Sequence, residues 1–425
     1  MQISQQLAAQ AVGQVLGGRN LSVALEELFQ HHRNITPQQR ATSQDLAYGT
    51  IRFHTRLEAF LQQLLQKPLT NAFIHHLLLV SLYQLVYDKA GAHTVVNQAV
   101  LAAEKSRKTW AKGLVNAVLR NFLRQREALE QRLPDNEAIH YSYPQWWINK
   151  LRQQYPDHWQ AMLEAGNQHP PMTLRINQRH MATPDYLHLL QAEGWDARQV
   201  GEQAIMLGKA VPVHQLPGFG QGHVSVQDWG AQFAAQELDV SAGMRVLDAC
   251  CAPGGKTGHI LELADVDMSA MDNDASRLER VRQNMERLQL NATLVQGDAG
   301  LPQAWWDGVP YDRILADVPC TASGIVRRHV DIKWLRRAQD IETFSKQQKG
   351  ILQGLWRLLA KGGKLLYVTC SVFHEENRQQ IEQFLQSHDD ARLLPFKHVE
   401  LTNNHGQLLP GTDHDGFFYA LLQKV

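Results

Sequence analysis

The residues of this chain that could do chemistry together are its four cysteines and a set of aspartates. Residues 248–257 read D-A-C-C-A-P-G-G-K-T, residues 317–320 read D-V-P-C, and residues 369–371 read T-C-S. A deprotonated thiol is a strong nucleophile, and a carboxylate beside it can stabilise charge that a reaction creates. The glycine-rich end of the first segment leaves two alternatives: a loop for a nucleoside triphosphate, or a loop for another adenosine-containing cofactor beside thiol chemistry.

The glycine-rich segment does not fit the triphosphate pattern. That pattern, G-x-x-x-x-G-K-[ST], wraps phosphates in backbone N–H groups and needs a glycine where this chain has Cys250. No expected strand is followed by G-x-G-x-x-G either, so an NAD site is poorly supported. A strand, a turn of small residues and a helix N-terminus remain, and they suit a ligand with a ribose and a carboxylate.

The elements that must position these residues follow from the pattern after Met244. Short apolar runs alternate with helical patterns, which predicts βαβ units and a parallel sheet. Ligands of such sheets bind outside the carboxyl ends of the strands. Asp272 and Asp298 stand at the second and third expected strand ends, and every cysteine also lies at a strand end. Each acid alone is compatible with a solvent-exposed strand end, but the set favours a cofactor site.

Cys320 and Cys370 share one crevice if the fourth and fifth strands are neighbours. A free cysteine is often just a small buried apolar residue, but two of them beside Asp317 favour a reaction centre. The chemistry alone leaves open which thiol is the nucleophile. The cysteines form no C-x-x-C pair and the histidines no H-E-x-x-H spacing, so we expect neither a disulfide framework nor a metal site.

Three motifs carry a specific resemblance. D-A-C-C-A-P-G-G-K-T, D-V-P-C-T-A-S-G and Y-V-T-C-S-V-F-H-E-E-N, in this order, resemble the RNA cytosine-C5 methyltransferases. The usual forms in that family are D-x-C-A-A-P-G-G-K-T, D-A-P-C-S-x-x-G and T-C-S-x-x-x-x-E-N, so Cys251 and Val318 replace alanines. The segments V-V-N-Q-A-V-L-A-A-E-K and G-L-V-N-A-V-L-R resemble the RNA-binding antitermination protein NusB.

The resemblance implies that S-adenosylmethionine is the cofactor. It implies a cofactor site formed by Cys250, Cys251, Ala252, Pro253, Gly254, Gly255, Lys256, Asp272, Asp298 and Asp317. It further implies 16S ribosomal RNA as the substrate, at cytosine 967 in the usual numbering of that RNA.

The same resemblance assigns roles to the reactive residues. Carbon 5 of cytosine is too weak a nucleophile unaided, so a thiolate first adds to carbon 6 and turns carbon 5 into an enamine carbon. By resemblance Cys370 is this nucleophile, Asp317 lies at the base and the cofactor, and Cys320 assists product release. DNA cytosine methyltransferases use a Pro-Cys cysteine instead, which makes Cys320 the rival nucleophile.

The chain is expected to contain three domains. Apolar residues at three-and-four spacing predict an all-α, NusB-like RNA-binding bundle at residues 1–140. Mixed patterns with a P-P break predict a small α+β connecting unit at residues 141–235. Residues 236–425 are expected to form an α/β, Rossmann-like methyltransferase domain. A non-catalytic RNA-binding assembly or antitermination factor with the same fold is the alternative, and the presence of both thiols with Asp317 favours the enzyme.

Local charge decides where RNA could bind, because 42 basic side chains balance 42 acidic ones. Residues 101–126 hold seven cations against Glu104, and residues 327–337 hold five against Asp331. Either segment could be a solvated helix face, and phosphate binding is the functional interpretation.

With no signal-peptide pattern and no apolar run of about 18 residues, we expect a monomeric cytoplasmic protein with no membrane or metal partner.

Overall fold

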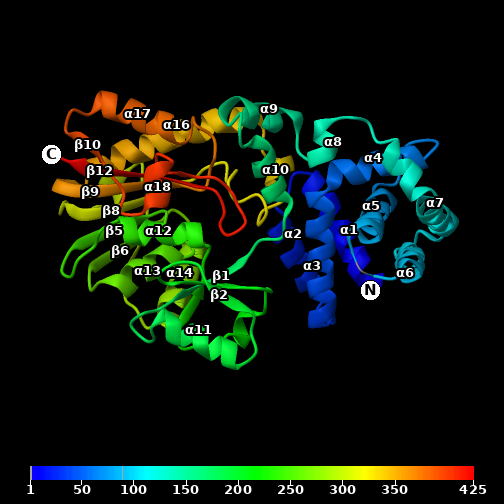
Figure 1. Ribbon diagram of the computed structural model, residues 1–425, viewed down its shortest axis with the longest axis horizontal. Helices are drawn as coiled ribbons and strands as arrows, with labels where there is room; N and C mark the ends of the chain where they lie inside the picture. Colours follow the sequence, from blue (N-terminus) through cyan, green and yellow to red (C-terminus); the bar gives the residue numbers. More distant parts are fainter. Residues whose placement is uncertain (1, 89) are drawn as a thin grey trace. The chain divides into compact units, whose positions relative to one another are not determined.

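The computed structural model describes residues 2–88 and 90–425, and the chain forms two compact units (Figure 1). The first unit comprises the chain up to Gln168 together with Val326–Ala338. The second comprises His169–Ile325 and Gln339–Val425. The chain therefore leaves the second unit, contributes 13 residues to the first and returns. The three-domain division at residues 140 and 235 stays a prediction.

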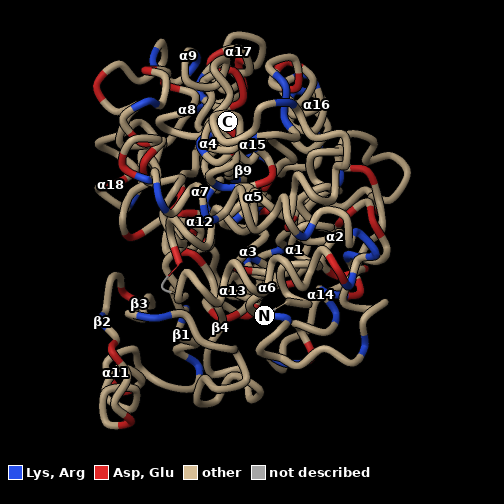
Figure 2. The backbone as a smooth tube through the Cα atoms, turned by 90° about the vertical axis from the view of Figure 1, so that its right-hand side faces the viewer, with Lys and Arg blue, Asp and Glu red and all other residues tan. Residues whose placement is uncertain are grey.

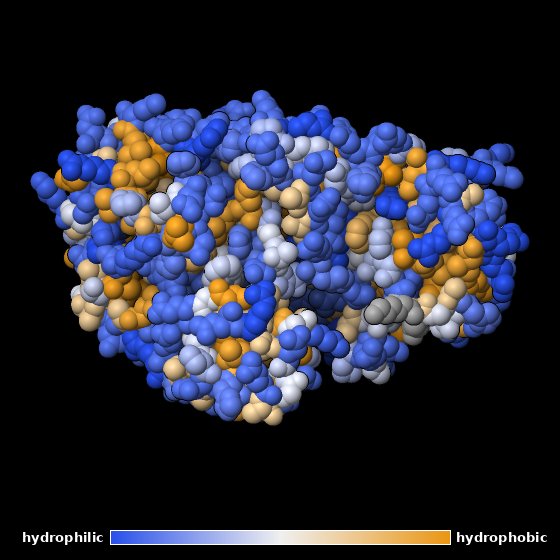
Figure 3. All heavy atoms as spheres, viewed as in Figure 1, coloured by the Kyte–Doolittle hydropathy of each residue, from blue (hydrophilic) through white to orange (hydrophobic). Residues whose placement is uncertain are grey.

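The surface carries both signs of charge. Lysines and arginines and acidic residues are both spread along the backbone (Figure 2), and their numbers are equal. On the face drawn in Figure 3 most of the surface is hydrophilic, and hydrophobic side chains form small separate patches.

Every regular element of the first unit is helical within its described residues. The elements are α1 (Gln2–Leu16), α2 (Leu21–His31), α3 (Pro37–Arg52), α4 (His54–Leu64), α5 (Ala72–Tyr87), α6 (Ala92–Lys105), the 3-10 turn η1 (Thr109–Ala111), α7 (Lys112–Gln131), α8 (Glu137–Tyr141), α9 (Gln145–Gln154), α10 (Trp159–Asn167) and α15 (Ile332–Leu335). The start of α3 is fixed by a capping box, in which Thr36 and Gln39 each accept a hydrogen bond from the other's backbone N–H.

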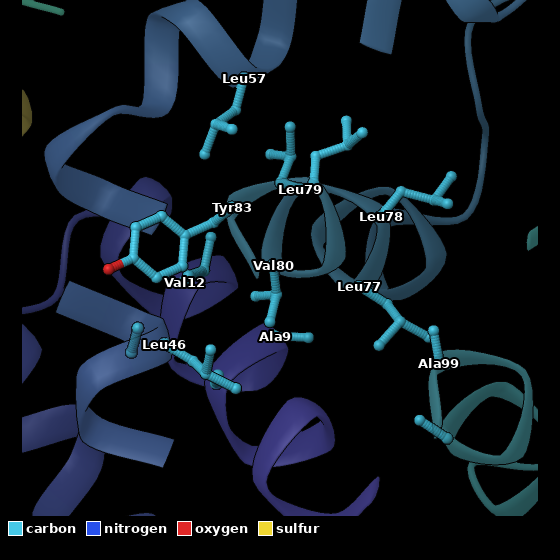
Figure 4. Packing of buried hydrophobic residues seen from close by; sticks show 14 of the residues in the cluster. Ala9, Val12, Leu46, Leu57, Leu77, Leu78, Leu79, Val80, Tyr83 and Ala99 are labelled. Atoms are coloured by element: carbon cyan, nitrogen blue, oxygen red, sulfur yellow. The ribbon is translucent and has the colours of Figure 1, made fainter. Parts of the chain in front are cut away.

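Helix α5 forms the centre of this unit because it is apolar on nearly every side. Its residues Leu77, Leu78, Leu79 and Val80 are fully buried, and they lie among side chains of α1, α3, α4 and α6 (Figure 4). The all-α bundle predicted from the spacing of apolar residues is confirmed.

The returning segment, Val326–Ala338, is part of this helical core. The Asp331 carboxylate accepts hydrogen bonds from the side-chain amide of Asn20 (2.8 Å) and the backbone N–H of Leu21 (2.9 Å), so it caps α2. Lys333 is fully buried and its ammonium group donates to Asn167 Oδ1 at 2.5 Å and to the backbone carbonyls of Arg52 and Ser142.

The second unit contains two sheets. The smaller is antiparallel, in the order β2-β3-β1-β4. Its elements are β1 (Met172–Ile176), α11 (Thr183–Ala192), β2 (Ala197–Gln199), β3 (Ala204–Leu207), the 3-10 turn η2 (Val213–Gln215) and β4 (Val224–Val226). This is the small α+β element expected between the bundle and the methyltransferase domain.

The larger sheet has eight strands in the order β10-β12-β9-β8-β5-β6-β7, with β11 paired to β12. Its strands are β5 (Arg245–Ala249), β6 (Asp267–Asp272), β7 (Thr293–Gln296), β8 (Tyr311–Asp317), β9 (Leu359–Thr369), β10 (Ala391–Leu394), β11 (Gln407–Leu408) and β12 (Phe417–Lys424). Strands β5 to β9 are mutually parallel, and β12 runs antiparallel to β9. The predicted Rossmann-like α/β fold is confirmed.

Helices cover both faces of this sheet. They are α12 (Trp229–Glu237), α13 (Gly255–Leu263), α14 (Ala275–Leu288), η3 (Pro302–Ala304), α16 (Ala338–Trp356), α17 (Arg378–Ser387) and α18 (Val399–Asn403). Alternate residues of β5 belong to different cores: Val246 packs with α13 and α14, whereas Leu247 packs with α16 and α17. The strand order reverses between β5 and β8, which is where a ligand crevice is expected in such sheets.

Candidate active site

The loop after β5 turns tightly and leaves open space at the second of its two glycines, Gly255. Cys250 has a φ of 64° and Gly254 a φ of 93°, both in the left-handed region that favours glycine. A side chain at Gly254 would also meet Val281 at 3.1 Å, whereas nothing lies within 4 Å of a Cβ built on Gly255. The loop therefore presents open backbone at the start of α13, where a helix N-terminus favours a negatively charged group.

The acids expected to bind a cofactor lie at adjacent strand ends. Asp272 is buried at the end of β6, and its carboxylate accepts hydrogen bonds from the backbone N–H groups of Ala252 (3.3 Å) and Asp274 (3.1 Å). Asp298 follows the neighbouring strand β7 and is exposed. Asp272 is thus fixed to the glycine-rich loop, while Asp298 is open to a ligand.

Lys256 connects the loop to the reaction centre. Its ammonium group lies 2.6 Å from a carboxylate oxygen of Asp317, at the end of β8. Burial disfavours the charge on Lys256, but the carboxylate of Asp317 outweighs burial and raises the Lys256 pKa above its usual value.

The two predicted thiols are adjacent. Strands β8 and β9 are parallel neighbours, and the sulfur atoms of Cys320 and Cys370 lie 3.3 Å apart. Cys320 is buried and Cys370 is half-buried. The hydrogen bond with Cys370, together with burial, raises the pKa of Cys320 well above its usual value. At neutral pH Cys320 therefore keeps its proton.

A buried carboxyl group joins the residues that follow the two cysteines. Glu376 accepts hydrogen bonds from the backbone N–H of Thr321 (2.8 Å), the Thr321 hydroxyl (2.5 Å) and the Ser371 hydroxyl (2.5 Å). The side-chain amide of Gln348, on α16, also donates to it at 3.1 Å. Burial raises the pKa of Glu376.

Asn377 fixes the backbone on both sides of Cys370. Its side-chain oxygen accepts from the Thr369 hydroxyl at 2.6 Å, and its side-chain nitrogen donates to the Ser371 carbonyl at 2.8 Å. Glu376 and Asn377 were not among the predicted site residues. Their signal was present as the E-N at the end of the third motif, but spacing alone does not show what they contact.

The segment after Cys320 also approaches other backbone closely. A side chain at Gly324 would collide with the carbonyl of Gly416, so only glycine fits there. The Gly324 N–H donates to the Cys370 carbonyl at 2.8 Å, which adds another connection between the two cysteine segments.

The predicted basic segment at residues 327–337 differs from the expectation. Arg327 and Lys333 are buried, and their burial excludes these two from contact with RNA phosphates. The interpretation of this segment as phosphate-binding is therefore wrong for Arg327 and Lys333, which are buried in the helical unit.

The comparisons with known proteins identify the family. The family model of the 16S rRNA methyltransferase RsmB/F matches residues 235–423, a ferredoxin-like domain of RsmF/B-like methyltransferases matches residues 143–214, and the NusB family matches residues 2–124. The ribosomal RNA small subunit methyltransferase B of Pectobacterium carotovorum is 44% identical, with 98% of each chain covered. That of Vibrio cholerae is 43% identical and covers 98% of this chain and 96% of its own.

The chain belongs to the RsmB/F family of 16S ribosomal RNA methyltransferases.

Solved structures agree with this RsmB/F assignment. A methyltransferase homologue from Pyrococcus horikoshii is 27% identical with a TM-score of 0.59, over 68% of this chain and 97% of its own. The crystal structure of PH0851 is 21% identical and shows the same fold, with a TM-score of 0.81 over 100% of this chain and 99% of its own. The family assignment favours the enzyme over the non-catalytic alternative.

As a member of the RsmB/F methyltransferases, the chain uses S-adenosylmethionine, which supplies the methyl group. The loop fits such a ligand, because the open backbone at Gly255 can receive a carboxylate and Asp298 is an exposed hydrogen-bond acceptor.

The described residues contain no group of three or more His, Cys, Asp or Glu side chains placed to hold a metal ion. Within residues 2–88 and 90–425, no helix combines the length and apolar character needed to cross a membrane.

Proposed function

We propose that this enzyme methylates carbon 5 of a cytosine in 16S ribosomal RNA, cytosine 967 in the usual numbering, through a covalent adduct with Cys370. The observation that supports this proposal best is the pair of sulfur atoms, 3.3 Å apart, beside the ion pair of Lys256 and Asp317. Methylation of carbon 5 requires a nucleophile at carbon 6, and two thiols with a carboxylate provide one nucleophile and groups that exchange protons.

Cys370 is the proposed nucleophile. Its sulfur bonds to carbon 6 as the electron pair of the carbon 5–carbon 6 double bond shifts into the ring, which makes carbon 5 nucleophilic. Cys320 keeps its proton and is the more deeply buried thiol, so it is the poorer source of a thiolate. This difference favours Cys370 over the rival assignment, in which Cys320 attacks.

Asp317 and Cys320 have supporting roles. Asp317 faces the base and the cofactor and is held by Lys256; a proton passed from the Lys256 ammonium group through Asp317 to N3 of the base neutralises the negative charge that the addition pushes into the ring. After methylation, loss of the carbon 5 proton and breakage of the sulfur–carbon 6 bond restore the aromatic ring. Cys320, in contact with the departing Cys370 sulfur, donates its proton to that sulfur and takes up the carbon 5 proton in its place.

The cofactor residues remain proposals of the same kind. We propose that residues 250–256 surround the methionine end of S-adenosylmethionine, that Asp272 and Asp298 bind its ribose and adenine, and that Asp317 contacts the methyl-bearing end. The positions of these acids at the ends of β6, β7 and β8 support this assignment.

The test is a denaturation-resistant protein–RNA adduct. Cys370→Ala and Cys320→Ala are each incubated with 16S ribosomal RNA and S-adenosylmethionine, and adducts are separated under denaturing conditions. We expect none with Cys370→Ala and an accumulated adduct with Cys320→Ala, because release is impaired. An adduct formed by Cys370→Ala would transfer the nucleophile role to Cys320. Mapping of the methylated nucleotide in the product RNA tests the position.

A further inference from the structure

Trp110 is the most exposed large apolar side chain among the described residues of the helical unit, with 61% of its surface accessible. It lies in η1, the short turn between α6 and α7. The next residue, Ala111, is fully buried, as is Val115 one turn further on, so the turn itself is anchored to the core. The indole ring therefore projects from a fixed position, and burying its large flat surface against a ligand would be favourable.

The surface beside Trp110 is kept flat by small residues. Gly113 lies three residues further on, exposed in the first turn of α7, and nothing lies within 4 Å of a Cβ built on it. Its φ is not in the left-handed region, so neither packing nor backbone geometry requires glycine. Glycine is unfavourable in a helix relative to alanine. Ala117, the next residue along this row, is also small and exposed.

Cations flank Trp110 in sequence on both sides. Arg120 and Arg124 continue the exposed row of α7, three and seven residues beyond Ala117, and they are about 6 Å apart along the helix axis. Arg120 is oriented by a hydrogen bond to Asn116 (2.9 Å). At the end of α6 and in the connection to η1, the side chains of Lys105, Arg107 and Lys108 have no ion-pair partner among the described residues, whereas Lys112 pairs with Glu104 at 3.1 Å.

We propose that this surface binds a single-stranded segment of the substrate RNA. One unpaired base stacks on the Trp110 indole across Gly113, and the cations of α6, η1 and α7 contact the phosphates on either side. An aromatic platform flanked by cations is the common solution for single-stranded nucleic acid, because every base has a face to stack and every nucleotide a charge to neutralise. A protein partner fits less well, since lysine is depleted in protein–protein interfaces.

This inference goes beyond the proposed function by giving the helical unit a definite contact with RNA, and it rests on RNA being the substrate. It also gives the predicted phosphate-binding segment at residues 101–126 an aromatic residue that charge counting alone did not identify.

The test measures affinity of the full-length protein for a fluorescent single-stranded RNA of roughly 12 nucleotides, within the range of single-strand sites. We expect Trp110→Ala to weaken binding roughly ten-fold and Trp110→Phe, which keeps an aromatic face, to weaken it less than about three-fold. Gly113→Leu should weaken binding while leaving the circular dichroism spectrum unchanged, because its side chain has open space. The matched control is Val399→Ala, since Val399 is also 61% exposed but lies in the other unit.

The cations are tested by salt dependence. The double variant Arg120→Ala/Arg124→Ala should make the slope of log affinity against log salt shallower by about 1.4, or 0.7 for each lost phosphate contact. Arg282→Ala, an exposed arginine of α14, is the control and should leave the slope unchanged.

Unchanged RNA affinity of Trp110→Ala would overturn the proposal. This test is independent of the adduct test of Cys370. If Cys370→Ala still formed an adduct, the proposed nucleophile would be wrong, and a loss of RNA affinity in Trp110→Ala would still support RNA binding at this surface.

Discussion

The carboxyl group of Glu376 makes a sharp prediction about what holds the two thiols together. Glu376→Ala removes the acceptor of the Thr321 backbone N–H and of two hydroxyl groups. A buried N–H without a partner costs about 1–3 kcal/mol, and each lost hydrogen bond about 1 kcal/mol more, so the local loss is about 3–5 kcal/mol. The residues directly after Cys320 and Cys370 should then open readily.

The assay is hydrogen–deuterium exchange, read by mass spectrometry on peptides that contain residues 320–325 and 369–376. A loss of about 3 kcal/mol corresponds to exchange faster by roughly 100-fold. We also expect kcat for methyl transfer to fall while KM for RNA changes little, because Glu376 orders the thiols rather than the substrate. The matched control is Glu382→Ala, an exposed acid of α17.

Glu376→Gln separates the charge of this group from its hydrogen bonds. Glutamine keeps an oxygen for the Thr321 N–H, and its amide can donate to the two hydroxyls, so we expect most of the kcat to return. Because the folded state raises the pKa of Glu376, it binds a proton that the unfolded state releases. Stability therefore falls as pH rises from the usual glutamate pKa towards the raised one, and Glu376→Gln should remove this decrease. Exchange and turnover in Glu376→Ala equal to those of Glu382→Ala would refute the reasoning.

Two further predictions concern the elements around the site and the helical core. Gly324→Ala should abolish methyl transfer with little change in the helical content seen by circular dichroism, because the added methyl collides with Gly416 next to the Cys320 segment; normal kcat would contradict this. Lys333→Ala should destabilise the helical unit by about 3 kcal/mol, because three oxygen acceptors lose their donor in a buried site. Amide exchange of α2 and α3 measures that loss, and exchange as slow as in the unsubstituted protein would contradict it.

The sequence predicted the meeting of the thiols for a physical reason. Parallel strands end at one edge of the sheet, so segments that follow consecutive strands converge even when many residues separate them. In the structure Asp317 pairs with Val368 across β8 and β9, and this register brings Cys320 and Cys370 together. Alternation of apolar runs and helices placed both cysteines at strand ends, but their meeting was predicted only on the condition that the fourth and fifth strands are neighbours, which the structure shows they are.

The contacts of single polar side chains could not be predicted in the same way. The buried Lys333 was interpreted as part of a basic surface because its neighbours in sequence are charged, whereas its partners are oxygens of Arg52, Ser142 and Asn167. Glu376 likewise contacts Thr321, which lies on another strand end. Periodicity describes which side of an element faces the core but not which distant donor or acceptor a polar group meets there.

The closeness of the thiols also explains why one site contains two cysteines with different proposed roles. Two thiolates 3.3 Å apart would repel, so the pair carries at most one negative charge near neutral pH. The hydrogen bond with Cys370, together with burial, raises the pKa of Cys320 and disfavours the charge there, and Cys370 is the more accessible of the two sulfurs. The proton kept by Cys320 then remains in contact with the Cys370 sulfur, available when the bond to the base breaks. Both residues are cysteine, so their surroundings decide which sulfur attacks. Only a change in those surroundings would make Cys320 the nucleophile.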